Sequence, residues 1–456
     1  MFWTLFLTIS VKSLPTRLAA KPRAGRQAAQ AGSPSPPFQF MNHYNVIVIG
    51  AGPSGMMAAL RAAEITDSVA LFEKNASLGR KLGLTGKGRC NITNVSGLDV
   101  FLEKFGKKGL FLRNVFNKFF VDDLIRFFKD RGLEVKTERQ GRVFPATDRS
   151  ISVIDVFKKA MAKAGVDVRL SSSVHSVKVL EDGIKRVCFT DGKEVFAKTV
   201  IIATGGVSYP QTGSTGDGLR IACELGHRIE EASGGLVPLE TQEFFVRDMQ
   251  GLTLKNIRIT FFAGNKKIES SIGELLFTHF GVSGPLILDI SSDICKLLKK
   301  SKVRMLIDLK PGLEPGQLNI KMQREFQVSG SLMIKNYLAD ILPNRLVAVV
   351  LRSSKVSGEK KCHQITAPER SSLVSALKAL ELTITRPRPI VEAMVTEGGV
   401  SLNEINPQTM ESRKAKGVYF CGEVLDLAAA SGGFNLQAAF STGYLAGESA
   451  ASKVCD

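Results

Sequence analysis

The sequence predicts an α/β fold in which a doubly wound, Rossmann-like parallel sheet is interrupted by an inserted domain. Three segments support this prediction. A buried-strand run at 46–49 leads into a glycine-rich turn and a helix, a second strand at 199–203 ends in small residues, and a third at 417–421 ends in Gly422-Glu423. Small residues at the carboxyl ends of parallel strands leave room for a ligand, which is where doubly wound folds bind one. The sequence between 226 and 389 lacks this pattern, and we expect it to form the insert.

The glycine-rich turn, Gly50-Ala51-Gly52-Pro53-Ser54-Gly55, has the spacing of a dinucleotide-binding fingerprint. Gly50 makes the tight turn, Gly52 lets the backbone approach a pyrophosphate, and Gly55 lets the helix pack on the strand. The helix N-terminus adds free N–H groups and the positive end of its dipole. A second apolar run at 69–72 ends on Glu73, near the spacing of a carboxylate that binds a ribose. We therefore predict a dinucleotide site.

The predicted domain organisation is discontinuous. Residues 42–225 form the first part of the dinucleotide-binding domain, 226–389 a substrate-covering insert that is β-rich and then helical, and 390–456 the second part. Two expectations concern single elements. Phenylalanine and leucine recur at helical spacing from 116 to 128, which predicts one core helix. Short alternating runs between 174 and 197 predict an antiparallel meander, followed by a separate buried strand at 199–203.

Residues 1–41 differ in composition from the rest of the chain. Up to residue 40 they contain no acid, carry five cations and end in a Pro/Ser-rich run. We expect them to lie outside the fold, either as an organellar transit segment or because the start codon is placed ahead of Met41. The predicted localisation is cytoplasmic, with an organelle as the alternative if residues 1–40 are a transit peptide.

The chain is basic, with a formal net charge of +18, of which +13 remains without the leader. Such a charge permits binding to nucleic acid or another polyanion. The cations are spread out, and the densest groups have no interleaved aromatic residues to stack on bases. We therefore predict a solvated basic surface rather than a nucleic-acid partner.

Cysteine, histidine and hydropathy patterns exclude several classes of site. The seven cysteines include no CxxC pair, which fits a reducing compartment and argues against a disulfide framework or a redox-active dithiol. The five histidines show no ligand spacing, so we predict no metal. No apolar run approaches the roughly 18 residues of a membrane-spanning helix, and we expect no membrane partner. The oligomeric state is left open.

Five sequence words carry a resemblance to one family: GRKLGLTGKGRCNITN, GRVFPATD, ATGGVSYPQTGSTGDG, GELLFTHFGVSGP and GEVLDLAAASGGFNLQAAFSTGYLAG. Together with the glycine turn they resemble the FAD-dependent oxidoreductases typified by bile-acid dehydro-reductase, also called aminoacetone-oxidase-like, from Asn45 to Ala450. The resemblance implies a flavoprotein of the two-dinucleotide-binding-domain type. In such a protein both ends of the chain hold one non-covalent FAD, and a late acid binds ribityl hydroxyls.

Residues in these words and in the glycine turn, together with Glu73, Lys74 and Val174, are assigned to FAD. They are Gly50, Ala51, Gly52, Pro53, Ser54, Gly55, Glu73, Lys74, Arg80, Lys81, Gly88, Arg89, Cys90, Asn91, Val174, Ala203, Thr204, Gly205, Gly422, Glu423, Asp426, Gly432, Gly433, Phe434 and Asn435. Glu423 stands where the family more usually has Asp, so Asp426 is a second candidate for the ribityl hydroxyls. A helix opening at Asn435 would direct its N–H groups at the reduced flavin ring.

Two further features have open interpretations. Cys90 is flanked by Lys87 and Arg89, which would lower its pKa and favour a thiolate near the flavin, but we favour a packing role because no second cysteine adjoins it. The loop 212–218 is either an anion-binding nest facing the substrate or a plain connector.

The predicted function is hydride transfer through FAD between NAD(P)H, or a small organic substrate, and an acceptor that is an activated C=C bond or dioxygen. Only one GxGxxG follows a strand, so NAD(P)H would bind transiently. The catalytic acid or base is not identified, with Tyr209 and His279 as candidate proton donors. The alternatives are an FAD-dependent RNA-modifying enzyme and a non-catalytic flavin-binding sensor.

Overall fold

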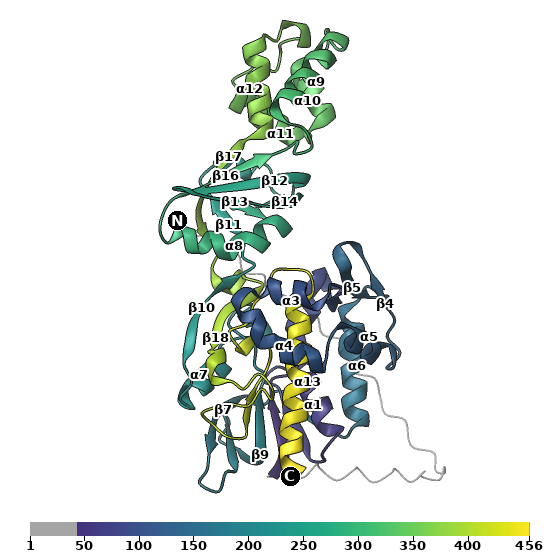
Figure 1. The fold of residues 1–456 in the computed structure, drawn as a ribbon, viewed down its shortest axis with the longest axis vertical. Helices are drawn as coiled ribbons and strands as arrows, with labels where there is room; N and C mark the ends of the chain where they lie inside the picture. Colours follow the sequence, from purple (N-terminus) through teal and green to yellow (C-terminus); the bar gives the residue numbers. More distant parts are fainter. Residues whose placement is uncertain (1–42, 456) are drawn as a thin grey trace, which may run out of the picture. The chain divides into compact units, whose positions relative to one another are not determined.

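A mostly parallel, seven-stranded sheet carries the glycine turn (Figure 1). The computed structural model describes residues 43–455, so the interpretation of residues 1–41 lies outside the described residues. The strand order is β6-β2-β1-β9-β8-β7, with β19 also paired to β9. The strands are β1 His43–Ile49, β2 Val69–Phe72, β6 Asp167–Arg169, β7 Val174–Val179, β8 Lys185–Phe189, β9 Glu194–Ile202 and β19 Val418–Phe420. Strands β6, β2, β1, β9 and β19 run parallel, so their carboxyl ends share one edge.

Strand β9 corrects one expectation. The predicted strand of the meander at 195–197 and the predicted buried strand at 199–203 form this single element. Its first residues pair antiparallel with β8, in the register Lys185 to Ala197, and its last residues pair parallel with β19, in the register Val418 to Val200. One strand thus belongs to both the hairpin and the parallel sheet, because its two halves have different neighbours.

Helix α1 (Pro53–Ala63) and helix α13 (Phe434–Cys455) pack side by side against the sheet (Figure 1). Glycines of α13 allow this approach: a Cβ atom on Gly443 would lie 2.3 Å from the carbonyl oxygen of Ser54, and one on Gly447 would lie 2.4 Å from that of Ala58. The other helices of this part are α2 Arg80–Leu84, α3 Leu98–Lys104, α4 Gly109–Lys118, α5 Val121–Lys129, α6 Ser150–Lys163 and α7 Asp217–Glu224.

The predicted core helix at 116–128 is two helices, α4 and α5, which corrects a second expectation. Phe119 and Phe120 between them have extended backbones, and the Asp123 carboxylate accepts a hydrogen bond from the Phe120 N–H at 2.9 Å. This cap begins a new helix. A small sheet in the order β3-β5-β4 lies nearby, formed by β3 Thr93–Asn94, β5 Arg142–Pro145 and β4 Val135–Thr137.

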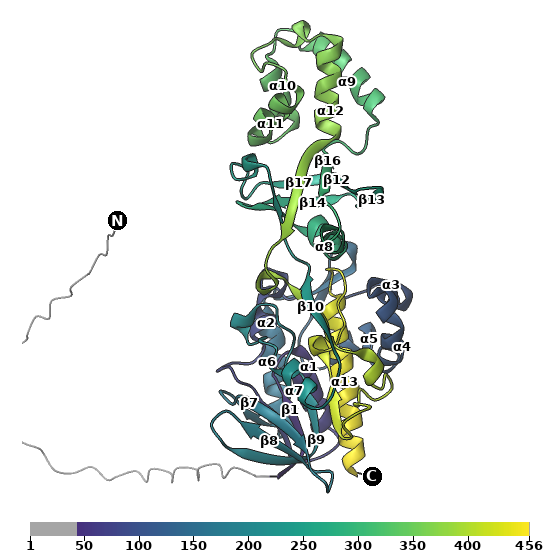
Figure 2. The ribbon, with the colours of Figure 1, turned by 90° about the vertical axis from the view of Figure 1, so that its left-hand side faces the viewer.

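An antiparallel sheet and a group of helices make up most of the region between residues 239 and 387 (Figure 2). Its strands are β11 Leu239–Thr241, β12 Thr253–Ala263, β13 Lys266–Glu269, β14 Gly273–Phe277, β15 Gly281–Ser283, β16 Val303–Asp308 and β17 Leu380–Pro387. Strand β12 pairs with both β14 and β16, which closes the sheet into a ring. Helix α8 (Pro285–Leu298) follows β15, and α9 Pro315–Val328, α10 Ile334–Ile341, α11 Asn344–Ser354 and α12 Ala367–Lys378 lie between β16 and β17.

Two separate clusters of buried hydrophobic residues correspond to these two regions. The first draws on residues 44–222 and 400–451, and the second on residues 239–384. Strands β10 (Ile229–Gly235) and β18 (Val395–Val400) pair antiparallel where the chain leaves and re-enters the first region. The structure therefore has the predicted α/β class with an added β-rich part, while the domain boundaries stay a prediction. None of the helices within residues 43–455 is long and apolar enough to span a membrane.

Candidate functional site

A cavity lies at the carboxyl edge of the parallel sheet, and many of the predicted residues line it. It encloses about 1370 Å³, counting the space at its opening. The predicted residues in its wall are Gly50, Ala51, Gly52, Pro53, Ser54, Glu73, Lys74, Arg80, Lys81, Val174, Ala203, Thr204, Gly205, Gly422, Glu423 and Asn435. They come from five distant parts of the sequence, which the shared edge of β1, β2, β9 and β19 brings together.

The glycine turn has the geometry that an approaching phosphate needs. Gly50 has φ +100°, a conformation that favours glycine. A Cβ atom on Gly52 would meet nothing within 4 Å, so the backbone there is open to the cavity. A Cβ atom on Gly55 would lie 1.8 Å from the Gly50 carbonyl oxygen, which explains why Gly55 itself is packed behind the wall. No side chain caps the N-terminus of α1, so its first N–H groups are available to an anion.

Glu73 follows the last residue of β2 and is 8% exposed in the cavity wall. Its carboxylate accepts hydrogen bonds from the Ala51 N–H at 2.8 Å and from the Asn75 N–H and side-chain amide at 2.8 and 2.6 Å. These donors fix the carboxylate beside the glycine turn. A charged acceptor in this position is suited to a ribose hydroxyl.

The loop after β9 joins the Glu73 end of the cavity. Asn75 donates to the Thr212 carbonyl at 3.1 Å, and Lys74 forms an ion pair with Asp217 at 2.6 Å. Arg80 donates to the Asn75 side chain at 2.8 Å. The proposed nest at 212–218 thus contributes to the cavity wall beside Glu73, whereas its predicted role toward the substrate stays untested.

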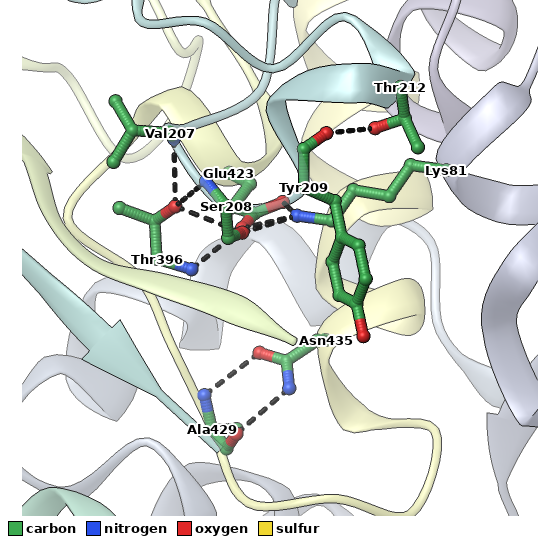
Figure 3. Close-up of polar contacts among 9 residues, drawn as sticks. All are labelled: Lys81, Val207, Ser208, Tyr209, Thr212, Thr396, Glu423, Ala429 and Asn435. Atoms are coloured by element: carbon green, nitrogen blue, oxygen red, sulfur yellow. Dashed lines mark hydrogen bonds and ion pairs between the residues drawn. The ribbon is translucent and has the colours of Figure 1, made fainter. Parts of the chain in front are cut away.

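Glu423 and Lys81, which also line the cavity, are at the centre of a polar network (Figure 3). The Lys81 ammonium donates to both Glu423 carboxylate oxygens, at 2.8 and 2.7 Å, and to the Ser208 hydroxyl at 2.7 Å. Glu423 also accepts from the Ser208 hydroxyl at 3.0 Å and from the Thr396 N–H at 2.7 Å. The network therefore links α2, the loop after β9, β18 and the turn after β19.

Asp426, the second candidate for the late acid, does not line the cavity. Its carboxylate accepts from Lys108 at 2.5 Å and from the Gly398 N–H at 3.0 Å, which ties the turn after β19 to β18. The structure thus places Glu423, rather than Asp426, in the wall. Asn435 does line the wall, and its side-chain amide exchanges two 2.8 Å hydrogen bonds with the backbone of Ala429 (Figure 3).

The structure argues against the hypothesis that Cys90 is a thiolate near the flavin. Its side chain is fully buried outside the cavity wall, and burial raises the pKa of the Cys90 thiol to about 12. The neighbouring Arg89 does not lower it, because its guanidinium pairs with Glu138 and Asp148 and lies over the Phe144 ring. The burial of Cys90 supports the packing role that the sequence favoured. Gly88 and Asn91, in the same loop, also lie outside the wall.

Gly432, Gly433 and Phe434 lie outside the wall for a packing reason. A Cβ atom on Gly433 would lie 2.4 Å from the Thr93 carbonyl oxygen, and the Asn94 side chain donates to the Gly432 carbonyl at 3.1 Å. The Phe434 ring packs edge-on against Phe101, with centroids 4.7 Å apart. These residues hold the start of α13 against β3 and α3.

Sequence reasoning missed a group of small, polar or apolar residues in the wall. They are Ile49, Phe72, Asn75, Ser77, Gly79, Leu82, Thr85, Phe105, Ser172, Ser173, Ile221, Met394, Val395, Leu427, Leu436, Ala438, Ala439 and Thr442. Some had a signal: Asn75 and Ser77 follow the predicted strand at 69–72. Others, such as Met394, depend on how the chain returns from the inserted region.

The two candidate proton donors lie in loops outside the cavity wall. Neither Tyr209 nor His279 lines the cavity. His279 is exposed in the turn between β14 and β15. Tyr209 lies in the loop after β9, next to Ser208 of the polar network (Figure 3).

These residues fit a dinucleotide. The open face of Gly52, the uncapped helix and the Glu73 carboxylate lie in one wall, as a pyrophosphate and an adjoining ribose require. The buried Thr204 hydroxyl in the same wall has no hydrogen-bond partner among residues 43–455. Within the same residues, no group of three histidine, cysteine or acidic side chains is placed to hold a metal.

Residues 44–449 match the family described as the HI0933-like protein Rossmann domain. The chain belongs to this family. A 3-dehydro-bile acid delta(4,6)-reductase from Clostridium scindens is 30% identical to this HI0933-like protein over 409 residues, which cover 89% of this chain and 98% of the relative. Membership confirms the family of FAD-dependent oxidoreductases that the sequence words indicated.

A second relative of the HI0933-like chain is the ribosomal RNA dihydrouridine synthase of Haemophilus influenzae. It is 29% identical over 402 residues, which cover 87% of this chain and 96% of the relative. Among solved structures, 3-ketosteroid delta1-dehydrogenase from Sterolibacterium denitrificans aligns with a TM-score of 0.50 at 14% identity, covering 91% of this chain and all of that one. This structural likeness supports the fold class.

Proposed function

We propose that this FAD-dependent oxidoreductase is a reductase that saturates an electron-poor carbon–carbon double bond of a small organic molecule, with NAD(P)H as the hydride source. The observation that carries the proposal is the single cavity that combines a dinucleotide cradle with a further wall. That wall includes Phe105, Met394, Leu427 and Leu436. Apolar walls with a few polar groups are typical of small-molecule sites.

The chain's own residues have separable tasks in this proposal. Glu73 accepts a hydrogen bond from the adenosine ribose, and the Gly52 backbone with the first turn of α1 holds the pyrophosphate. The positive end of α13 lies at Phe434–Asn435, where its dipole would stabilise negative charge on the ring of a bound flavin. FAD, when bound, supplies the hydride acceptor and donor.

The names of the two full-length relatives support an electron-poor carbon–carbon double bond as the acceptor. A delta(4,6)-reductase of a 3-dehydro-bile acid and a dihydrouridine synthase both saturate a carbon–carbon double bond conjugated with a carbonyl group. Their molecules otherwise have little in common. The shared chemistry therefore favours an electron-poor C=C bond over dioxygen as the acceptor.

Transient binding of NAD(P)H follows from the single fingerprint. The Gly50–Gly55 turn is the one GxGxxG that follows a strand, and its cradle is assigned to FAD. The reductant would therefore enter the open part of the cavity and leave before the acceptor binds. Ping-pong kinetics is the expected pattern.

An anaerobic acceptor screen tests the proposal. The FAD-loaded protein is reduced with NADH or NADPH, and recovery of the flavin absorbance is followed after adding 2-cyclohexen-1-one, a 3-oxo-4-ene bile acid or air. We expect an enone to reoxidise the flavin faster than air does. Faster reoxidation by air than by every enone would indicate an oxidase, and no turnover with any reductant or acceptor would indicate a flavin-binding sensor.

A uracil base in RNA is the second candidate substrate, favoured by a group of unpaired cations. Arg352, Lys355 and Lys361 are exposed, and none has an acidic partner among residues 43–455. Such cations can contact phosphates. Filter binding to ribosomal RNA at 50 and 200 mM salt, with assay of dihydrouridine, separates the candidates. Salt-dependent binding together with formation of dihydrouridine would favour RNA as the substrate. The absence of both would favour the small molecule.

A further inference from the structure

We infer that Tyr209 contacts the substrate and donates the proton that completes reduction of the double bond. The inference rests on the proposed function and assigns the missing proton donor. Addition of hydride to one carbon of an electron-poor C=C bond leaves the neighbouring carbon to take a proton. In this assignment the Tyr209 O–H bond breaks, a C–H bond forms at the carbon next to the carbonyl group, and the phenolate recovers a proton from solvent.

The backbone of Tyr209 is the first observation. Its φ and ψ are 53° and 57°, in the left-handed region, which bulky residues rarely adopt. Within the described part of the chain, several non-glycine residues have a positive φ, and Tyr209 is the one aromatic residue among them. Strain of this kind persists where surrounding contacts impose it, and it concentrates at functional sites.

Contacts on both sides of Tyr209 impose this conformation. The Tyr209 N–H donates to the Val391 carbonyl at 3.2 Å, and the Tyr209 carbonyl accepts from the Thr212 N–H and hydroxyl at 2.8 and 2.7 Å. Just before it, the N–H groups of Val207 and Ser208 donate to the Thr396 hydroxyl at 2.9 and 3.1 Å. The Lys81–Glu423 network thus holds the residue ahead of Tyr209, and Thr212 holds the residue itself (Figure 3).

The position of Tyr209 is the second observation. Thr204 and Gly205 before it and Thr212 to Ser214 after it line the cavity, whereas Tyr209 does not. Its backbone partner Val391 precedes Met394 and Val395, which also line the cavity. Tyr209 therefore lies at the border of the cavity and outside the volume that the dinucleotide cradle encloses. A substrate that enters between the cradle and the 391–395 segment passes this residue.

The side chain of Tyr209 is free to act. The ring is partly exposed, and its hydroxyl has no hydrogen-bond partner within residues 43–455. By contrast, the hydroxyls of Tyr44, Tyr337 and Tyr419 all donate to protein acceptors. Figure 3 shows the Tyr209 ring extending away from the Ser208–Glu423 contacts, with its hydroxyl at the far end.

The test compares Tyr209→Phe with Tyr444→Phe, which removes another hydroxyl without a hydrogen-bond partner in the described residues. Reduced, FAD-loaded protein is mixed anaerobically with 2-cyclohexen-1-one or a 3-oxo-4-ene bile acid. We expect Tyr209→Phe to slow reoxidation of the flavin by 10²- to 10⁴-fold, the usual contribution of a general acid. Reduction by NAD(P)H and the Kd for FAD should change less than about 2-fold, because neither needs the donated proton. Tyr444→Phe should match the wild type.

Two outcomes separate this inference from the function on which it rests. If the wild type reduces an enone and Tyr209→Phe does so equally fast, Tyr209 is not the donor although the function stands. If the wild type reduces neither probe, the proposed function is wrong, and the inference about Tyr209 is wrong as well.

A stability measurement adds a readout independent of turnover. Tyr209→Gly relieves the left-handed strain, so the melting temperature of its apoprotein should be no lower than that of the wild type. A clear fall in melting temperature would show that contacts of the ring outweigh the backbone strain, which would overturn the strain argument for the assignment.

Discussion

Glu73 is the residue whose role follows most directly from its contacts. Three backbone and side-chain donors fix its carboxylate at the end of β2, next to the glycine turn. We predict that Glu73→Ala weakens FAD binding by about 1–3 kcal/mol, roughly 5- to 150-fold in Kd, because a buried ribose hydroxyl loses its charged acceptor. Fluorescence titration of the apoprotein with FAD measures this change.

Glu181→Ala provides the matched control for Glu73→Ala, because Glu181 is exposed in the turn between β7 and β8. Its Kd should equal that of the wild type. The melting temperature of the Glu73→Ala apoprotein must be measured as well, since the substitution also frees the Ala51 N–H. Unchanged FAD affinity in a folded Glu73→Ala protein would remove Glu73 from the ribose site.

Cys90 and Cys421 should be inert thiols in the native protein. Burial raises the pKa of each thiol to about 12, so almost none is thiolate at pH 8. We predict that iodoacetamide at pH 8 alkylates the exposed Cys223 and Cys455 and spares Cys90 and Cys421, as measured by peptide mass spectrometry. In urea all seven cysteines should react. Native labelling of Cys90 would restore the thiolate hypothesis.

At the element scale, the contact between α1 and α13 supports the cradle. A Cβ atom on Gly443 would lie 2.3 Å from the Ser54 carbonyl oxygen, which belongs to the first turn of α1. We predict that Gly443→Ala destabilises the protein by about 1–3 kcal/mol, the usual cost of overpacking, and weakens FAD binding because the first turn must shift. Urea unfolding and FAD titration measure the two effects.

Gly316→Ala is the control for Gly443→Ala. Gly316 lies in α9, and a Cβ atom there would meet nothing within 4 Å. Alanine in an open helical position should leave stability unchanged or raise it by about 0.5–1 kcal/mol. Equal effects of the two substitutions would show that the α1–α13 contact is not close-packed in solution.

The elements that the sequence predicted are those whose signals are local. The glycine turn, the strand at 69–72 and the acid after it are adjacent in sequence, and the structure puts them in one wall. Strand β9 was divided in two because its continuity depends on partners, β8 and β19, that lie far apart in sequence. The closed ring of β12 with β14 and β16 has no local signal for the same reason.

The predicted site differed from the structure where a residue's neighbours in sequence are not its neighbours in space. Arg89 and Cys90 lie in one of the sequence words that resemble the family. Arg89 nevertheless forms ion pairs with Glu138 and Asp148, and Cys90 is buried. Gly433 was read as a cofactor residue because it precedes a helix, but its lack of a side chain serves the approach to Thr93. Composition alone does not separate a glycine that faces a ligand from one that faces backbone.

At the scale of the whole molecule, the two hydrophobic clusters predict two units of unfolding. One cluster contains the cradle and draws on both ends of the described chain, whereas the other lies within residues 239–384. Because the cavity wall that we propose for FAD comes almost entirely from the first region, FAD should stabilise the unit built on the first cluster. A ligand at 100 times its Kd adds about 2.7 kcal/mol to the unit that binds it.

We therefore expect calorimetry of the apoprotein to show two transitions, of which saturating FAD raises one. Limited proteolysis during heating assigns them: the unshifted transition should expose sites within the predicted insert, residues 226–389, and the shifted one sites in α1 and α13. The discontinuity of the first unit makes this outcome specific, since its two parts must unfold together although the insert separates them in sequence. A single transition that FAD raises as a whole would show instead that the β10–β18 pair couples the two clusters into one cooperative unit.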